Sequence, residues 1–220
     1  MGIELKKRIF TSFILLVLLF LMITYTYILI ISLIMIAIVS WIEFYALISK
    51  IFLKNNFKER FLRFLYKAIS LLYLAALVFT ILIIESNNHD MRIFIFYSIL
   101  VSILSDIGGL ITGRIFRGKK LSKISPKKTI SGSIGSFIFS LFLIPFFVQY
   151  FTNYSFLSII IITIFISFIS QIGDLFISFI KRKAKVKDTS DLLPGHGGFL
   201  DRIDGIIFAL PSGLILFNLF

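Results

Sequence analysis

Long apolar runs alternate with short polar segments along the whole chain. Each run approaches or exceeds the roughly 20 residues that a helix needs to cross the hydrocarbon layer of a bilayer. Because lipid offers no hydrogen-bond partners, such runs cross it as helices whose backbone groups pair internally. The pattern predicts an all-α integral membrane protein, a polytopic bundle of about seven transmembrane helices, over residues 9–24, 27–49, 64–84, 93–113, 130–151, 156–180 and 204–220.

The division between the first two predicted helices depends on aromatic residues. Residues 9–49 form one apolar stretch about twice as long as a span, so the chain must turn back within it. Tyr25 and Tyr27 mark that turn, since tyrosine favours the membrane–water interface. A basic segment ending at Arg8 precedes the first run, but no small-residue cleavage site follows it, so we expect a retained helix.

Composition agrees with this fold class. Hydrophobic residues make up 58% of the 220 residues, 27 of them are phenylalanine, and the mean hydropathy is +1.01. A soluble domain cannot carry such a surface in water, so most of the chain must lie in lipid. The sequence contains no cysteine, which excludes disulfides, thiol catalysis and cysteine-ligated zinc.

The basic residues predict the orientation of the bundle. Of the 23 lysines and arginines, 22 lie in four segments, which end at Arg8 or cover residues 50–67, 114–128 and 181–202. Seven spans place all four segments on one side, which the positive-inside rule makes cytoplasmic. Attraction to anionic headgroups also explains the net charge of +12. Nucleic-acid binding is not expected, because the basic residues flank spans and belong to no soluble module.

Acidic residues interrupt two of the predicted spans. Asp106 and Asp174 each lie roughly 10 to 12 Å inside the basic boundary. A carboxylate there costs on the order of 3 kcal/mol, so it indicates a paired or functional group. Asp174, Ser178 and Lys181 follow one another at helical spacing and share one face. Such a face can hold a metal ion and a phosphate together.

A second acidic pair lies at the start of the last predicted span. Asp201 and Asp204 are three residues apart, so they point to the same side of a helix. Carboxylate oxygens are the ligands that Mg²⁺ prefers, although such a pair can also simply complement the helix dipole. Before it, glycines flank His196, and their amides are free to approach a phosphate. An ordinary loop with glycine and proline fits the same residues, with His196 as a hydrogen-bonding residue of that loop.

The loop over residues 114–128 is densely cationic. It holds seven basic residues around Ser125 and Pro126, which suits a polyphosphate or a phospholipid headgroup as well as a purely topological role. The run from Gly113 to Lys120 approaches a P-loop, but Lys120 stands where a Ser or Thr is required and no strand precedes it. We therefore reject a P-loop.

One segment resembles a family signature. Residues 178–204 read SFIKRKAKVKDTSDLLPGHGGFLDRID. This run resembles the carboxyl-terminal signature of the phosphatidate cytidylyltransferases, also called CDP-diacylglycerol synthases. The matching positions are Ser178, Lys181, Arg182, Lys187, Asp188, Pro194, His196, Gly197, Gly198, Asp201, Arg202 and Asp204. The segment 105–129 is similar to a second block of the family, and Gly173 with Asp174 matches its Gly-Asp-Leu element.

The amino-terminal half resembles the family only through a Trp-x-Glu-Phe element at Trp41 to Phe44. Ser131 and Ile177 stand where members usually or often carry Glu, and the chain is one membrane hairpin shorter than typical members. Residues 1–90, with about three spans, have few polar residues within those spans, whereas residues 91–220 have acids, glycines and serines within theirs. The resemblance makes residues 91–220, with cytoplasmic loops 114–129 and 181–203, the catalytic region.

The resemblance implies an enzyme that transfers a cytidylyl group from CTP to phosphatidic acid. It assigns Asp174, Asp201 and Asp204 to Mg²⁺, with a second monovalent or divalent cation as a further expectation. The remaining catalytic candidates are Lys181, Asp188 and His196, and the substrate-binding candidates are Ser178, Arg182, Lys187, Arg202, Arg114, Lys127 and Lys128. We also expect membrane lipid as a partner, a homodimer, and a multi-pass protein of the inner or plasma membrane with its active site facing the cytoplasm.

Two other functions fit membrane-embedded acids. A CDP-alcohol phosphotransferase also uses them with magnesium, but its Asp-Gly-x-x-Ala-Arg element is absent from the sequence. A transporter or channel would carry acids near the midplane, often in broken helices, whereas Asp106 and Asp174 lie near one face beside a cationic loop.

Overall fold

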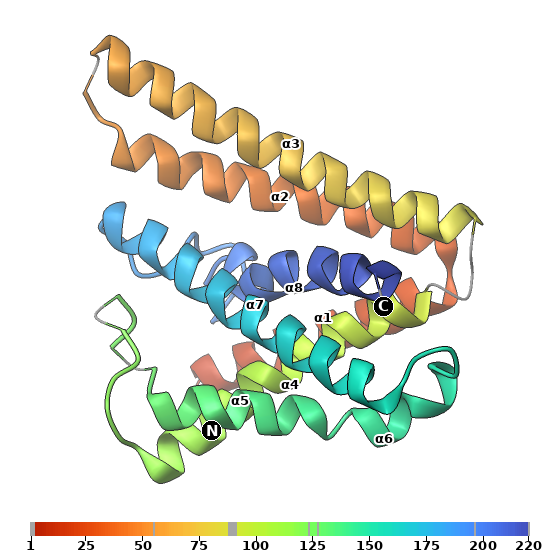
Figure 1. Ribbon diagram of the computed structural model, residues 1–220. Coiled ribbons are helices and arrows are strands. Elements are labelled where there is room, and N and C mark those ends of the chain that lie inside the picture. The colour runs from red at the N-terminus through yellow and green to blue at the C-terminus, as the bar shows by residue number, and fades with distance from the viewer. Residues whose placement is uncertain are drawn as a thin grey trace. The chain divides into compact units, whose positions relative to one another are not determined.

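The computed structural model describes residues 3–54, 56–87, 92–122, 124–126, 128–195 and 197–219. Over these residues the ordered elements are helices, with two isolated β-bridges and no β-strand (Figure 1). In chain order they are α1 (Ile3–Thr24), α2 (Thr26–Ile51), α3 (Phe57–Asn87), α4 (Arg92–Phe116), α5 (Ile130–Leu141), α6 (Ile144–Phe147), η2 (Val148–Tyr150), α7 (Phe156–Lys183) and α8 (Leu200–Leu219). The predicted all-α membrane fold class is confirmed.

Five helical segments within the described residues are long and apolar enough to cross a membrane. They are Thr26–Ile51, Phe57–Ile84, Arg92–Phe116, Ile130–Tyr150 and Phe156–Lys183, which correspond to the second to sixth predicted spans. The first and seventh predicted spans lie in the helices α1 and α8. The full count of seven spans stays a prediction, and the protein is multi-pass.

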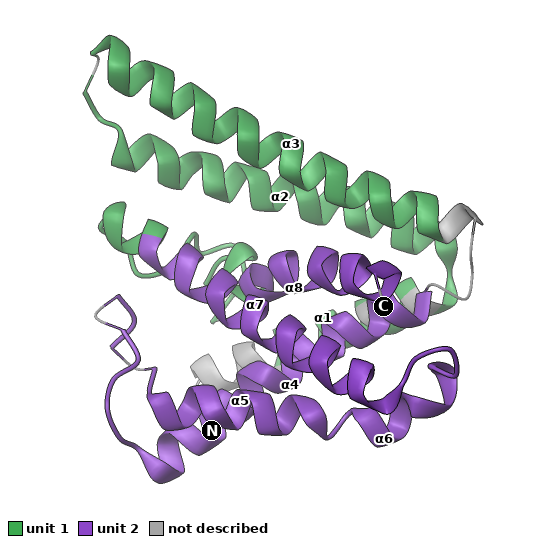
Figure 2. Cartoon of the chain, in the orientation of Figure 1, with its two compact units in different colours: residues 1–87, 180–202 green, residues 88–179, 203–220 purple. Residues whose placement is uncertain are grey.

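The chain forms two compact units (Figure 2). Unit 1 consists of residues 1–87 and 180–202, so the end of α7 and the loop after it belong with the amino-terminal helices. Unit 2 consists of residues 88–179 and 203–220. The family signature is therefore divided between the units.

In unit 1 the break between α1 and α2 falls where the sequence predicts it. Tyr25 has extended backbone angles (φ −123°, ψ 111°) and interrupts the helix for one residue. At the other end of α2 the Phe52 amide donates to the Ile48 carbonyl at 3.2 Å. The Lys54 amide then donates to Glu59 at 2.9 Å, and this carboxylate lies in the first turn of α3, where it complements the helix dipole.

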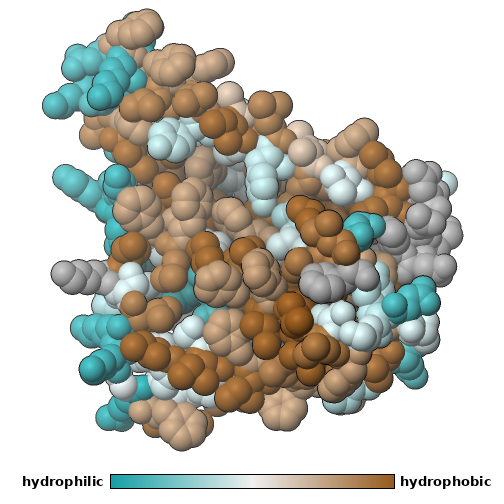
Figure 3. Space-filling view, viewed as in Figure 1, coloured by the Kyte–Doolittle hydropathy of each residue, from teal (hydrophilic) through white to brown (hydrophobic). Residues whose placement is uncertain are grey.

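The surface pattern of α2 is the reverse of that of a soluble helix. Ile38 and Ile42 are about half exposed, whereas Ser40 and Glu43 are buried. Apolar side chains also predominate on the face of the molecule that Figure 3 shows. Apolar groups on the outside and polar groups inside are stable only where the surrounding solvent is lipid.

In unit 2 a seam of hydroxyl groups joins α4 to α7. Ser102 and Ser170 share a hydrogen bond of 2.7 Å, and Ser167 donates to Ser105 at 3.0 Å. Small residues let two helices approach closely, and their hydroxyls satisfy each other away from water. This seam holds together the two helices that carry Asp106 and Asp174.

Glycines bring α4 and α5 together. A Cβ atom on Gly109 would lie 2.7 Å from Ser136 Oγ, and one on Gly113 would lie 3.0 Å from Thr129 Oγ1. Small residues at these positions therefore let the two helices pack closely.

The predicted continuous helix over residues 130–151 is interrupted. The Leu143 amide bonds the Ser140 carbonyl in a tighter turn, and the short α6 follows with a proline in its first turn. Pro145 has no amide hydrogen, so a regular α-helix cannot run through this point without losing a bond.

Candidate active site

The signature begins where α7 ends and reverses direction. Lys185 has a left-handed backbone (φ 57°), and the Val186 amide donates to the Lys181 carbonyl at 3.0 Å. This arrangement is typical of a helix carboxyl terminus and turns the chain back toward α8. The returning loop is closed by the Leu193 amide, which donates to the Gly197 carbonyl at 2.8 Å.

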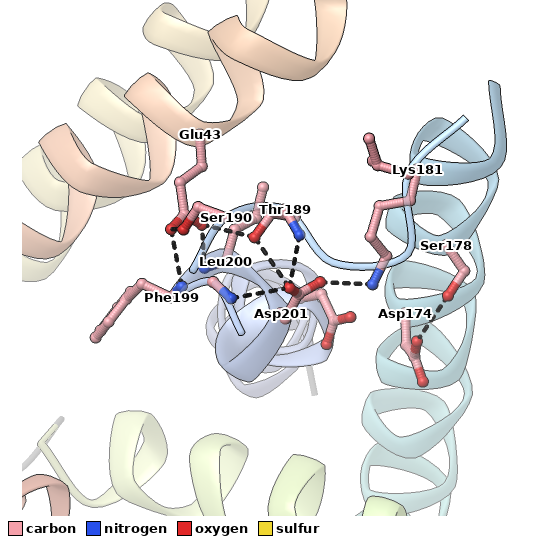
Figure 4. Close-up of polar contacts among 12 residues, drawn as sticks. Glu43, Asp174, Ser178, Lys181, Thr189, Ser190, Phe199, Leu200 and Asp201 are labelled. Carbon is pink, nitrogen blue, oxygen red and sulfur yellow. Dashed lines mark hydrogen bonds and ion pairs between the residues drawn. The ribbon is translucent and has the colours of Figure 1, made fainter. Parts of the chain in front are cut away.

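Asp201, in the first turn of α8, is the centre of a hydrogen-bond network in unit 1 (Figure 4). Lys181 Nζ bonds its Oδ1 at 2.6 Å, and both side chains are nearly buried, 11% and 6% exposed. Its Oδ2 accepts hydrogen bonds from the amides of Thr189 at 2.8 Å and Gly198 at 3.1 Å. The network therefore fixes both the loop and the ammonium group around one carboxylate.

The environment of Asp201 favours its ionised form. Burial alone would raise the pKa of this carboxyl. The hydrogen bonds from Lys181 and Thr189 outweigh burial, so the pKa lies below its ordinary value. The carboxylate is charged at neutral pH.

Glu43 is a site residue that the sequence analysis did not assign. It lies on α2 and is 5% exposed. It accepts three hydrogen bonds from the loop between α7 and α8 (residues 184–199), which we call the signature loop, and one from Leu200, the first residue of α8. The donors are Ser190 Oγ at 2.5 Å, Leu200 N at 2.7 Å, Thr189 Oγ1 at 2.8 Å and Phe199 N at 2.9 Å (Figure 4). The Trp-x-Glu-Phe element was the only sequence signal for Glu43, and that element does not identify the residues that bond this carboxylate.

Two glycines of the signature are required by this packing. Gly197 has φ +82°, which favours glycine over other residues, and it forms the bridge to Leu193. A Cβ atom on Gly198 would overlap Thr189 Oγ1 and lie 2.8 Å from Glu43 Oε2. The glycine-rich segment thus packs closely against Thr189 and Glu43, and the Gly198 amide donates to Asp201.

The other predicted residues of unit 1 lie around this loop. Lys187, Asp188 and Arg202 line a cavity of about 530 Å³. Arg182 lies apart from that cavity and donates to the Val186 carbonyl at 3.2 Å. His196 falls outside the described residues, so its role stays a prediction. Two predicted substrate-binding residues, Lys187 and Arg202, and one predicted catalytic residue, Asp188, therefore share one polar cavity.

In unit 2, Asp174 lies in a second cavity of about 400 Å³. It forms an ion pair with Lys128 and accepts a hydrogen bond from Ser178 Oγ at 3.3 Å. Asp106 and Arg114 line the same cavity, so the predicted acids of the two spans do meet there. Lys127 falls outside the described residues.

Gln171 contributes an unexpected polar group to this cavity. Its Oε1 accepts a hydrogen bond from Ser133 Oγ at 2.5 Å, while its Nε2 is buried and has no hydrogen-bond partner among the described residues. An unsatisfied buried donor facing a cavity is well placed to bond an anionic oxygen. Ser131, which replaces the family's Glu, bonds the Arg117 carbonyl and Thr129 instead.

The three predicted metal ligands belong to different units. Asp174 and Asp204 lie in unit 2, and Asp201 lies in unit 1. Asp204 is 7% exposed and accepts a hydrogen bond from the Gly205 amide at 2.9 Å. Within neither unit do three described His, Asp or Glu side chains gather as metal ligands. The convergence of the three acids on one ion stays a prediction.

Comparison with known proteins identifies the family of this chain. The profile of the "Cytidylyltransferase family" matches residues 3–220. A phosphatidate cytidylyltransferase of Staphylococcus haemolyticus is 37% identical over 180 residues, 79% of this chain and 68% of that protein. Phosphatidate cytidylyltransferases of Bacillus subtilis and Rickettsia bellii are 38% identical over 143 residues and 36% identical over 158 residues.

The matched regions cover 62% and 67% of this chain for the Bacillus and Rickettsia proteins. They span 52% of the Bacillus protein and 67% of the Rickettsia protein. The profile covers the signature, the cationic loop and the Trp-x-Glu-Phe element together. The chain belongs to the cytidylyltransferase family.

Proposed function

We propose that this protein transfers a cytidylyl group from CTP to phosphatidic acid in phospholipid biosynthesis. A phosphate oxygen of phosphatidic acid attacks the α-phosphorus of CTP and forms a new P–O bond. The bond between the α-phosphorus and the oxygen that bridges to the β-phosphorus breaks, and pyrophosphate leaves with that electron pair. CDP-diacylglycerol is the other product, and the named relatives support this choice of substrates.

The Asp201 network carries the proposal. Phosphoryl-type transfer depends on positioning and on neutralising charge more than on proton transfer. Lys181 is held beside Asp201 by a bond of 2.6 Å, and Lys187 and Arg202 line the adjoining cavity. Lys181 is buried, whereas Lys187 and Arg202 are exposed at the cavity, and cations placed in this way suit the triphosphate and the departing pyrophosphate. Arg114, Lys128 and Gln171, around the second cavity, suit the phosphate of the lipid.

The donor chemistry fits Mg²⁺. The candidate ligands Asp174, Asp201 and Asp204 offer only carboxylate oxygens, which Mg²⁺ prefers in company with substrate phosphates. When bound, the ion would withdraw charge from the phosphate oxygens. A second cation would share these acids. Lys128 and Lys181 already neutralise two of the carboxylates, so a cation and a lysine would compete for the same oxygens.

The basic segments support an active site that faces the cytoplasm of the inner or plasma membrane. Lys181, Lys187 and Arg202 all lie in one of the four segments that hold 22 of the 23 basic residues. A site at that boundary leaves the acyl chains of phosphatidic acid in the bilayer while CTP arrives from water. A homodimer is a further expectation, which the molar mass of the purified protein in detergent tests.

The decisive experiment supplies purified protein with phosphatidic acid, radiolabelled CTP and Mg²⁺. CDP-diacylglycerol and pyrophosphate should form in equal amounts, with CTP preferred over UTP and ATP. Asp201→Asn should lower kcat by about 100-fold, since it removes a positioned charge. Glu59→Gln, a distant acid on α3, is the matched control and should keep activity. Wild-type rates in Asp201→Asn would refute the assigned role of this carboxylate.

A further inference from the structure

A groove runs along unit 1 between α2 and α3, which lie side by side (Figure 1). It consists of two cavities that share Trp41 and Leu71, and we refer to them together as the α2–α3 groove. The first cavity, about 620 Å³, contains Arg60, Arg63 and Lys67. The second, about 380 Å³, is lined by apolar side chains alone. The groove is therefore cationic at one end and apolar along the rest.

The cations of the groove have no carboxylate partner among the residues that line it. Lys67 Nζ lies 3.2 Å from the centre of the Tyr45 ring and donates to Ser49 Oγ at 2.7 Å. Arg63 donates one hydrogen bond, of 3.3 Å, to the Lys54 carbonyl. Its Nε is buried and has no hydrogen-bond partner among the described residues. A buried donor of a charged group without an acceptor points to an anionic oxygen as its ligand.

The apolar part indicates what carries that anion. From Lys67 to Leu82 the groove follows α3 for roughly 22 Å, about three-quarters of the thickness of the hydrocarbon layer. That is about the length of one extended acyl chain. Trp41 lies at the junction of the two parts, where an amphipathic ring meets the boundary between headgroup and acyl chain. Inorganic phosphate would use only the cationic end.

We propose that the α2–α3 groove binds an anionic glycerophospholipid. Its phosphate lies among Arg60, Arg63 and Lys67, and one acyl chain lies in the apolar part. This site is separate from the cavities around Asp174 and Asp188, and it doesn't depend on the proposed reaction. Glu43 lies two residues from both Trp41 and Tyr45, so it points to the opposite side of α2. The lipid would thus pack against the helix that anchors the signature loop.

The test measures lipid that stays bound to the purified full-length protein. The protein is reconstituted in phosphatidylcholine vesicles that contain about 10% phosphatidylglycerol as the anionic lipid. It is then extracted in mild detergent and analysed by mass spectrometry. Wild-type protein should retain phosphatidylglycerol in excess over its share in the vesicle. Arg60→Gln with Arg63→Gln should weaken that retention by about 25-fold, since each cation near an anionic surface is worth roughly fivefold. Lys58→Gln, an exposed cation of the same helix outside the groove, is the matched control and should retain the lipid.

A second pair of variants keeps every charge and fills only the apolar part. Ala75 lines the groove and Ala76 does not, although both are exposed residues of α3. Ala75→Trp should displace the lipid and Ala76→Trp should not. Thermal stabilisation by added phosphatidylglycerol but not by inorganic phosphate would support a lipid site. Equal lipid retention by all variants would overturn the proposal. It would also be overturned if the arginine variants lost a dimer but kept the lipid, because the groove would then be an interface between copies of the chain.

Discussion

At the scale of single residues, two lysines of the described structure each form an ion pair with an aspartate. Lys181 is bonded to Asp201, and Lys128 is bonded to Asp174. The sequence predicts each of these four side chains as a site residue but not the pairs, because spacing along a helix identifies a shared face and not a partner from another segment. Each lysine can therefore both hold an acid in place and meet a phosphate.

Removal of the Lys128 charge should separate substrate binding from folding. In Lys128→Gln, we expect the KM for phosphatidic acid to rise by about tenfold, as loss of one charge-assisted contact predicts. Its thermal midpoint should move little, because the side chain is partly exposed. Lys119→Gln, in the same loop and exposed, serves as the control. Unchanged kinetics in Lys128→Gln would return the loop to a purely topological role.

Loss of Glu43 should disorder the signature loop. Glu43→Ala leaves two backbone amides and the Ser190 hydroxyl without their acceptor, while the Thr189 hydroxyl keeps Asp201 at 3.0 Å. We therefore expect a loss of about 3 kcal/mol in the free energy of unfolding. Glu43→Gln retains one acceptor oxygen and should recover part of the stability. Glu59→Ala removes a carboxylate with one hydrogen bond and is the matched control.

The kinetics distinguish a positioning role from a merely stabilising one. Well below the thermal midpoint of Glu43→Ala, where the variant is folded, a positioning role predicts a lower kcat with the KM for CTP nearly unchanged. Wild-type kcat under those conditions would limit Glu43 to stability.

At the scale of helices, the sequence predicts positions well and interruptions poorly. The five long apolar helical segments follow from apolar length alone, and the turn at Tyr25 follows from its interfacial aromatics. The break before α6 was missed, because the apolar run continues through Pro145 and hydropathy does not register a missing amide hydrogen. Glu43 was missed as a site residue, because its partner Thr189 lies 146 residues away.

The contact between α4 and α5 should be intolerant of side chains. A Cβ atom on Gly135 would lie 2.5 Å from Thr112 Cβ and would force the helices apart. Gly135→Ala should therefore lower the free energy of unfolding by about 2 kcal/mol, seen as a lower thermal midpoint in detergent. Ile134→Ala, on the exposed side of the same turn, should have a much smaller effect. Equal shifts in the two variants would mean that the packing of these glycines is unimportant.

At the scale of the whole molecule, the absence of cysteine makes the topology directly measurable. Single cysteines can be placed at Lys119, in the cationic loop, and at Asn153, between η2 and α7. In sealed, right-side-out vesicles, Asn153→Cys should react with a membrane-impermeant maleimide. Lys119→Cys should react only after permeabilisation. The reverse pattern would invert the proposed sidedness and the cytoplasmic site with it.

Unit 1 is built from two stretches of chain with residues 88–179 synthesised between them. The ribosome therefore delivers Glu43 to the bilayer well before Ser190, Phe199 and Leu200, its hydrogen-bond donors, have been made. Until they arrive, that carboxylate must stay hydrated or accept hydrogen bonds from other donors. Membrane insertion of the first helices and completion of the signature loop are thus separate events, and a nascent chain arrested near residue 180 should contain correctly inserted helices without a formed site.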